Sequence, residues 1–241
     1  MSFVPGAAGA PATFPAGLVG GGNANIRASE GAGTTTLVAG TDNPSQVFNL
    51  SASRTVVLPS TGVNAGDVWV LENRAAFDMI VQSSALTALT VANSANQDAT
   101  VQQGYVVLRA LQALPTTPAH WLVEYVRDEA QYTGTTSGAI AVAFTINFLR
   151  INRLVSLQAL SASGTGTTNT ITASAGPVRI RPVSGGRYSG TAVVFNSTIV
   201  GGYCVMSTDG TTVWRKYDLS SFSGSCAIGS SPDFTHAVYA L

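Results

Sequence analysis

The side chains that could carry chemistry in this sequence are few and far apart. His120 and His236 are the only imidazoles, and Cys204 and Cys226 are the only thiols. Cys226 and His236 could be imagined as a nucleophile and its base, but no carboxylate pattern or helix N-terminus nearby would activate the thiol. No spacing of histidines and carboxylates suits a metal ion. We therefore expect both histidines to be structural.

The two cysteines leave two interpretations open. Cys204 and Cys226 lie 22 positions apart near the end of the chain and could form a disulfide bridge. A secreted disulfide scaffold is normally denser in cysteine and shorter than this chain. The sequence therefore favours two small buried thiols, with the bridge as the alternative.

Paired carboxylates are also scarce. Glycan hydrolysis needs two carboxyl groups held about 5–10 Å apart. Residues 132–241 contain only Asp209, Asp218 and Asp233, and Asp209 belongs to an Asp-Gly pair that is typical of a tight hairpin turn. The sequence also lacks the nucleophile-elbow, phosphate-loop and dinucleotide-binding motifs. We expect a protein that is not an enzyme, with no cofactor and no catalytic or metal residues.

Sugar binding is the alternative that the aromatic residues keep open. Aromatic faces stack on the apolar faces of sugar rings, and four aromatic residues of the second half could do so, namely Tyr188, Tyr203, Trp214 and Tyr217. The competing interpretation places all four in a core or a subunit interface, where aromatic side chains usually lie. The sequence does not decide between these two roles.

The elements that would position these residues are short strands. Apolar runs bounded by Gly, Pro, Asn or Ser predict a first set of strands at 54–59, 67–73, 77–81, 105–108 and 121–125. Within 67–73, Trp69 and Leu71 point to one face, while Val68 and Val70 point to the other. Both faces are apolar, which suits a strand covered on both sides by sheets or by a neighbouring subunit.

A second set of strands follows a cluster of alternating charges at 126–131, which breaks the β pattern and marks the expected domain boundary. The predicted strands are 139–148, 155–159, 170–173, 178–181, 191–195, 203–207, 212–217 and 236–241, with a helical turn as the alternative near 148–155. The uncharged run from 130 to 149 alternates with period two, so we expect a strand and no membrane insertion. The predicted fold class is all-β, with small β-sandwich or jelly-roll-like modules at 41–131 and 132–241.

Residues 1–40 are rich in Gly, Ala and Pro and carry isolated apolar residues at Phe3, Phe14 and Leu18. One interpretation is a disordered tail. The other is an extended N-terminal arm whose three apolar side chains dock on a neighbouring protein. No Lys or Arg precedes Arg27 and no compact apolar block follows, so we do not expect a secretory signal.

Charge is scarce and unevenly placed. Only 10% of the residues are charged, against about 25% in an average globular domain. Residues 1–131 carry nine acidic and five basic residues, and residues 132–241 carry three acidic and seven basic residues, giving net charges of −4 and +4. The bases are dispersed, which argues against a nucleic-acid partner. A surface with so little charge favours self-association.

Two segments together resemble a known family. The pattern Arg54-Thr-Val-Val-Leu-Pro59, then Gly66-Asp-Val-Trp-Val-Leu-Glu-Asn73, then Val81-Gln82 and Trp121-Leu-Val-Glu-Tyr125, resembles small β modules in fibre and decoration proteins of tailed bacteriophages. The later Ser207-Thr-Asp-Gly-Thr-Thr-Val-Trp214, followed by Phe222, Phe234 and Tyr239-Ala-Leu241, is similar to phage fibre ends. These motifs consist mostly of turn and core residues.

The resemblance implies a non-enzymatic homotrimer on the virion surface that contacts other capsid or tail proteins. A head decoration, such as a cement protein or head fibre, and a short fibre are both compatible with it, and a short arm with two compact modules slightly favours decoration. The alternative function is a tail-fibre receptor-binding protein that recognises a host surface polysaccharide.

Overall fold

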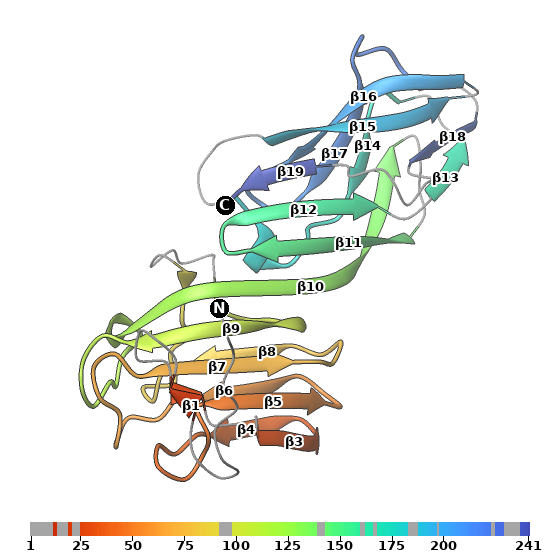
Figure 1. The fold of residues 1–241 in the computed structure, drawn as a ribbon. Helices are drawn as coiled ribbons and strands as arrows, with labels where there is room; N and C mark the ends of the chain where they lie inside the picture. The colour runs from red at the N-terminus through yellow and green to blue at the C-terminus, as the bar shows by residue number, and fades with distance from the viewer. Residues whose placement is uncertain are drawn as a thin grey trace. The chain divides into compact units, whose positions relative to one another are not determined.

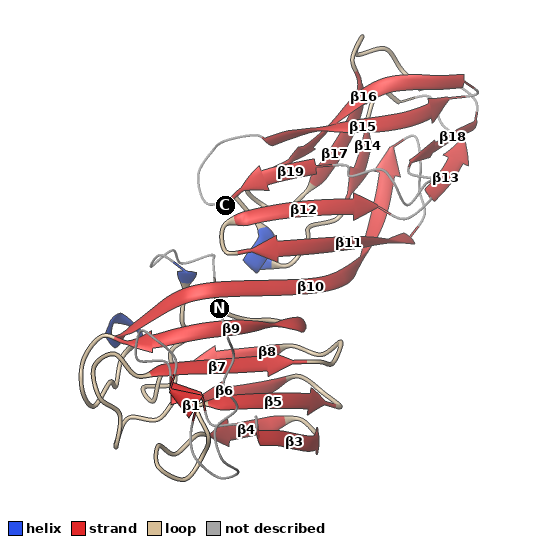
Figure 2. Ribbon diagram, viewed as in Figure 1, coloured by secondary structure: helices blue, strands red, loops and turns tan. Residues whose placement is uncertain are grey.

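Strands dominate the computed structural model, which describes residues 12–13, 19–20, 25–91, 98–138, 143–159, 162–165, 168–182, 188–196, 198–222, 225–228 and 237–241. Among these residues, Pro118–His120 and Val178–Ile180 form short 3₁₀ turns (Figure 2). The predicted all-β fold class is confirmed. The chain divides into two compact units, Met1–Asp128 and Glu129–Leu241 (Figure 1).

Unit 1 contains a short parallel coil in which successive strands alternate between two sheets. One sheet pairs β3 (Asn25–Glu30), β5 (Ser45–Leu50) and β7 (Val68–Asn73), and the other pairs β4 (Gly33–Thr36), β6 (Arg54–Val57) and β8 (Met79–Gln82). Every pairing among these six strands is parallel. Each pair of consecutive strands therefore completes one coil of a short β-solenoid.

This parallel coil differs from the sandwich or jelly roll expected for the first module. Those folds are built from antiparallel strands. The period-two pattern shows which face of a strand is buried, but it is the same for parallel and antiparallel neighbours. The pattern therefore does not predict whether neighbouring strands pair parallel or antiparallel.

The core of unit 1 lies between the two sheets. In β7 the side chains of Trp69 and Leu71 are buried, whereas Val68 and Val70 are half-buried on the outer face, as the alternation predicts. The buried cluster also includes Phe48 from the first sheet, with Val56, Leu58, Met79 and Val81 from the second. Burying one such side chain contributes about 1.5–3 kcal/mol, so the sheets are held together chiefly by this cluster.

The first coil corrects the expected boundary of the N-terminal arm at residue 40. Strands β3 and β4 lie before that residue, and Leu37 is 1% exposed within the unit 1 core. Arg54 Nε lies 2.7 Å from Glu30 Oε2, which ties this coil to the next. Residues 25–40 are thus part of the folded unit. Phe3, Phe14 and Leu18 lie outside the described residues.

Two antiparallel strands complete unit 1. β9 (Gln103–Ala110) pairs antiparallel with β7, and β10 (Trp121–Gly138) neighbours β9. The loop between β9 and β10 contains Pro115 and Pro118.

The charged cluster at 126–131 does not break the β pattern, contrary to the sequence-based expectation. β10 runs through it without interruption, because strand alternation directs Asp128 inward while Arg127 and Glu129 face outward. Asp128 is fully buried, and its Oδ1 accepts a hydrogen bond of 2.8 Å from the backbone N–H of Gln102. The division between the units falls after Asp128, inside this strand.

Unit 2 consists of antiparallel strands. Its larger sheet has the order β13 (Ala162–Thr165), β18 (Ser225–Ile228), β15 (Tyr188–Asn196), β16 (Thr198–Met206), β17 (Thr212–Lys216) and β14 (Ile171–Ala173), followed by the end of β10. The remaining strands are β11 (Ala143–Ile151), β12 (Leu154–Ala159) and β19 (Ala237–Ala240). One buried cluster contains Phe148 and Leu157 from β11 and β12 together with Met206 and Trp214 from the larger sheet. Unit 2 is thus a sandwich, as the sequence predicts.

Three local expectations for unit 2 are settled by the structure. The Asp209-Gly210 turn joins β16 to β17, with Gly210 at φ +86°, so the predicted hairpin is confirmed. The segment around Asn152 is the tight turn of the β11–β12 hairpin, which excludes the helical turn considered there. The predicted strand at 178–181 is wrong, because Val178–Ile180 forms a 3₁₀ turn after Pro177.

Candidate functional site

His120 has a structural role in the β9–β10 connection. Its Nδ1 accepts hydrogen bonds from the backbone N–H groups of Thr116 and Thr117, at 3.1 and 3.4 Å. Its backbone oxygen accepts the N–H of Leu111 at 2.8 Å. The imidazole therefore closes a turn. His236 lies outside the described residues.

The cysteine alternatives are resolved by strand register. Cys204 is a buried free thiol on β16 opposite Gly190, and Cys226 on β18 is opposite Asn196 of the same strand β15. Six residues of strand separate these positions, about 20 Å, which excludes a bridge. Burial raises the pKa of the Cys204 thiol well above its ordinary value, so the thiol stays protonated and unreactive at neutral pH.

The carboxylates of Asp209 and Asp218 in unit 2 serve turns. Asp209 Oδ1 accepts the N–H of Thr211 at 2.8 Å, and Asp218 Oδ1 accepts the N–H of Ser220 at 2.9 Å. These backbone hydrogen bonds lower the pKa of both carboxyl groups. A glycosidase acid needs a raised pKa, so neither group is suited to that role. Asp233 lies outside the described residues, and within the described ones no group of three His, Cys, Asp or Glu could hold a metal ion.

The four aromatic candidates for glycan contact are separated by the fold. Trp214 is 1% exposed and belongs to the core of unit 2, so its prediction as a possible glycan contact is wrong. Tyr188 lies on β15 opposite Met206, and its side chain is outside the described part of the structure. Tyr203 and Tyr217 lie together on the outer face of the sheet, with ring centroids 6.1 Å apart and ring planes 28° apart. Tyr217 is 62% exposed.

The local sequence explains how these two tyrosines meet. Tyr203 on β16 and Tyr217 just beyond β17 both alternate with buried neighbours, so they share the outer face. Gly201 makes room for the second ring, because a Cβ at that position would lie 3.0 Å from two ring carbons of Tyr217. Any larger residue at 201 would push Tyr217 away from Tyr203.

Arg215 completes this surface, and the sequence-based reasoning missed it. It is directly opposite Tyr203 in the β16–β17 register and shares the outer face with Tyr217 by period two. Within the described part of the chain, no hydrogen bond or ion pair engages its guanidinium. The spacing of Arg215 and Tyr217 was a usable signal, but only the register places both beside Tyr203. We call Tyr203, Arg215 and Tyr217 the aromatic platform.

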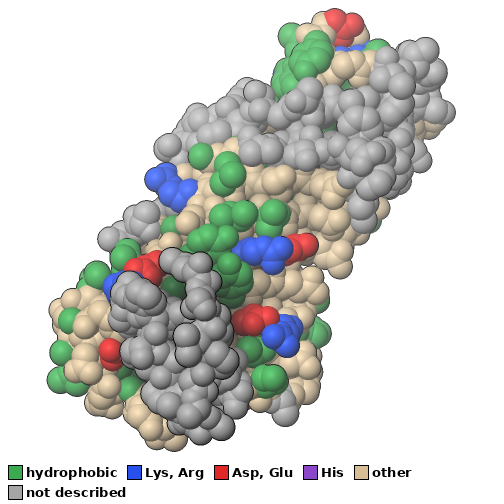
Figure 3. Space-filling model, in the orientation of Figure 1, with side chains coloured by type: hydrophobic (Ala, Val, Ile, Leu, Met, Phe, Trp, Pro, Cys, Tyr) green, Lys and Arg blue, Asp and Glu red, His purple; other side chains and the backbone are tan. Residues whose placement is uncertain are grey.

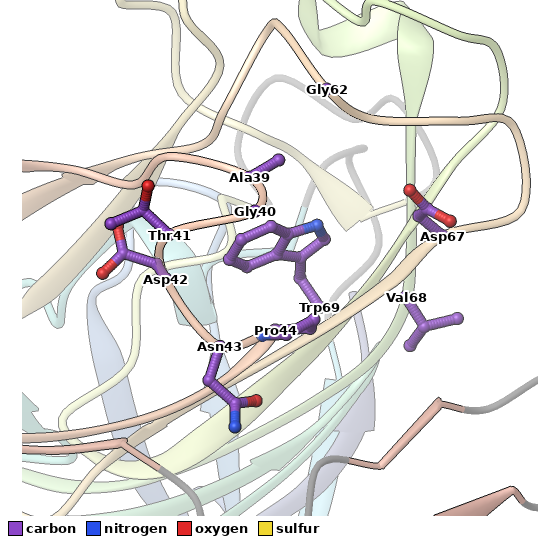
Figure 4. A pocket seen from close by; sticks show the side chains of 10 residues that line it. All are labelled: Ala39, Gly40, Thr41, Asp42, Asn43, Pro44, Gly62, Asp67, Val68 and Trp69. Atoms are coloured by element: carbon purple, nitrogen blue, oxygen red, sulfur yellow. The ribbon is translucent and has the colours of Figure 1, made fainter. Parts of the chain in front are cut away.

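Unit 1 carries a cleft of about 480 Å³ beside the loop from Ala39 to Pro44. Figure 4 shows the Trp69 indole at its centre, with Asp42 on one side and Asp67 on the other. Trp69 is only 2% exposed and forms a closed floor. Asp42 is paired with Arg27 at 2.7 Å, and Asp67 accepts the N–H of Asn64 at 2.8 Å. These carboxylates hold the loops of the cleft in place, so they are not poised for catalysis.

The outer face of the β7–β9–β10 sheet in unit 1 is more apolar than charged. It presents half-buried Val68, Val70 and Val107, the stacked rings of Tyr105 and Tyr125, and Leu122, which is 43% exposed. Its Arg109 is neutralised by Glu124 in an ion pair. Figure 3 shows hydrophobic side chains gathered along β10, with basic and acidic side chains beside them. We call this surface the apolar face.

Comparisons with known proteins add no identity. No protein-family model matches the chain, and no curated protein matches it. Among the described residues, no helix has the length and apolar character needed to cross a membrane.

Proposed function

We propose that this chain is a non-enzymatic structural protein of a tailed-bacteriophage virion. In this proposal it is a homotrimer on the particle surface, either a head decoration (cement protein or head fibre) or a short fibre, with decoration slightly favoured. The N-terminal segment, with Phe3, Phe14 and Leu18, attaches it to other virion proteins. The resemblance of the strand and turn motifs to phage fibre and decoration proteins supports the virion assignment.

The observation that carries the assembly proposal is the apolar face of unit 1. Val68, Val70 and Val107 are half-buried in a single chain, and no unpaired charge of the described residues interrupts them. Only 10% of the residues are charged, so there is little electrostatic repulsion to prevent two copies of the chain from associating through this face. Exposed apolar patches of this kind mark protein–protein contacts. A second copy of the chain is the occupant that we propose.

We predict that the wild-type protein sediments as a trimer at micromolar concentration and that Val70→Arg dissociates it. The substitution places an unpaired charge in the middle of the apolar face, where burial in an interface would be unfavourable. Thr36→Arg, at an exposed position on the other sheet of unit 1, should leave the trimer intact. Sedimentation velocity measures both. A wild-type monomer, or a trimer that survives Val70→Arg, would remove the apolar face from the proposal.

We predict that deleting residues 2–24 leaves the trimer intact but abolishes attachment to particles. The deletion ends before β3, so it spares every strand of the unit 1 coil. Each apolar side chain that docks on a partner contributes about 1.5–3 kcal/mol, and three copies in a trimer add through avidity. The test adds wild-type or truncated protein to particles that lack it and pellets the particles. Equal binding of both proteins would place attachment on the β units.

The same particles test the virion assignment itself. Labelled antibody on intact particles distinguishes a signal over the head, expected for a decoration protein, from a signal only at the tail, expected for a fibre. Absence of the protein from purified particles would reject the proposed function. That outcome would leave the trimer prediction standing, because sedimentation is measured on the isolated protein.

A second candidate function is a tail-fibre receptor-binding protein that recognises host surface polysaccharide. The exposed Tyr217 ring, stacked on the half-buried Tyr203, favours it, because Tyr217 is accessible to a ligand on the outer face of unit 2. Trp214 does not contribute, since it lies in the core.

A further inference from the structure

We infer that the aromatic platform of unit 2 binds an acidic saccharide, with the exposed Tyr217 stacking on a sugar ring, Tyr203 supporting Tyr217 from its other face and Arg215 binding a sugar carboxylate. This inference goes beyond the proposed assembly role and depends only on the surface of unit 2. It also narrows the ligand from any glycan to one that carries negative charge.

The first step is the geometry of the ring pair. The centroids of Tyr203 and Tyr217 are 6.1 Å apart, and the planes are within 28° of one another. Because the two rings stack on one another, Tyr203 supports one face of the Tyr217 ring, and the 62% exposed Tyr217 is left to stack on a sugar ring. Both tyrosine hydroxyls are free of hydrogen bonds to described residues and can serve as donors or acceptors.

The second step is the charge beside the rings. Arg215 is on the same face, directly opposite Tyr203, and no carboxylate of the described residues pairs with it. Asp218 follows closely in sequence, but its Oδ1 is bonded to the N–H of Ser220. A guanidinium offers a planar fork of donors that fits a carboxylate in a bidentate manner. The net charge of +4 over residues 132–241 adds a favourable long-range field for an anion.

Another tyrosine pair among the described residues provides a contrast. Tyr105 and Tyr125 in unit 1 also stack, with centroids 5.3 Å apart and planes 19° apart. There the arginine on the same face, Arg109, is already neutralised by Glu124. Aromatic stacking is therefore common to both surfaces, whereas an uncompensated guanidinium distinguishes the platform of unit 2. This contrast favours an anionic ligand for unit 2 and supplies an internal control.

The test is a titration of the purified full-length protein with oligogalacturonate and with neutral malto-oligosaccharides, followed by calorimetry. We expect oligogalacturonate to bind and the neutral sugar to bind at least about tenfold more weakly. Arg215→Gln should lower the affinity for oligogalacturonate by about tenfold, the loss that one hydrogen bond to a charged group explains. Added salt should weaken wild-type binding, because the guanidinium contact is exposed to screening.

The variants separate stacking from charge. Tyr217→Ala should lower the affinity for both sugars by about tenfold or more, whereas Tyr105→Ala should leave both affinities unchanged. Arg215→Lys should restore only part of the oligogalacturonate affinity lost in Arg215→Gln, because lysine lacks the bidentate fork. No binding of oligogalacturonate to the wild-type protein would overturn the inference, as would wild-type affinity in Arg215→Gln.

A protein partner is the competing occupant of this surface, and sedimentation and pelleting detect it. If Tyr217→Ala changes the oligomeric state or the binding to particles and oligogalacturonate does not bind, the platform is a protein interface and the saccharide inference is rejected. If Tyr217→Ala and Arg215→Gln assemble normally and lose only sugar binding, the inference is supported. Failure of the virion assignment would not affect either result.

Discussion

Gly104→Ala is expected to unfold unit 1 or to lower its free energy of unfolding by more than about 4 kcal/mol, at the extreme of single substitutions. A Cβ at this position in β9 would overlap the carbonyl oxygen of Arg127 and would lie 2.7 Å from its carbonyl carbon and 3.3 Å from the Cα of Asp128. These are backbone atoms of β10, so no side-chain rotation can relieve the overlap. The two strands would have to separate.

The matched control for this prediction is Gly31→Ala. A Cβ there would meet only Ser51 Oγ at 3.9 Å, an ordinary van der Waals contact, so stability should change by less than about 0.5–1 kcal/mol. Urea unfolding, together with limited proteolysis of any variant that expresses poorly, measures both changes. Gly104→Ala with wild-type stability would mean that β9 and β10 do not approach one another as described.

Trp214→Ala is expected to lower the free energy of unfolding of unit 2 by about 3–5 kcal/mol, the usual cost of removing a buried aromatic side chain. The indole is 1% exposed and packs in one cluster with Phe148 and Met206. Total domain stability is about 5–15 kcal/mol, so this loss would leave unit 2 marginally stable. Thermal unfolding followed by near-ultraviolet circular dichroism reports the loss.

Tyr217→Ala is the control for Trp214→Ala, because Tyr217 lies three residues further along and on the opposite face. With 62% of its surface exposed, it should contribute less than about 1 kcal/mol to stability. The stabilities of the two variants therefore distinguish a core aromatic residue in β17 from an exposed aromatic residue in the turn that follows it. Equal effects of the two substitutions would contradict the assignment of faces in β17.

Features that depend on local rules can be predicted from the amino-acid sequence alone. Alternation separated Trp69 and Leu71 from Val68 and Val70 in β7, because side chains of a strand point to opposite faces with period two. The turn at Asp209-Gly210 was predictable, because glycine there adopts positive φ without strain. The all-β class followed from many short runs of this kind.

Features that depend on partners distant in sequence are visible only in the folded chain. Alternation does not distinguish parallel from antiparallel pairing of β3, β5 and β7, so the sequence predicts a sandwich where the structure has a solenoid coil. The charges at 126–131 predict the end of a strand, because the local sequence does not show that Asp128 is buried with a hydrogen-bond partner. That partner is the N–H of Gln102, 26 residues away.

The candidate site shows the same division. Period two puts Trp214 and Tyr217 on opposite faces and Arg215 with Tyr217, but it does not tell which face is the core. That choice was made by the sheet of β11, β12 and β19, whose buried side chains share one cluster with Trp214. The register of β16 against β17 then placed Tyr203 opposite Arg215. Local sequence thus determines the faces of a strand, and the packing of distant strands determines which face is buried and which is free to bind.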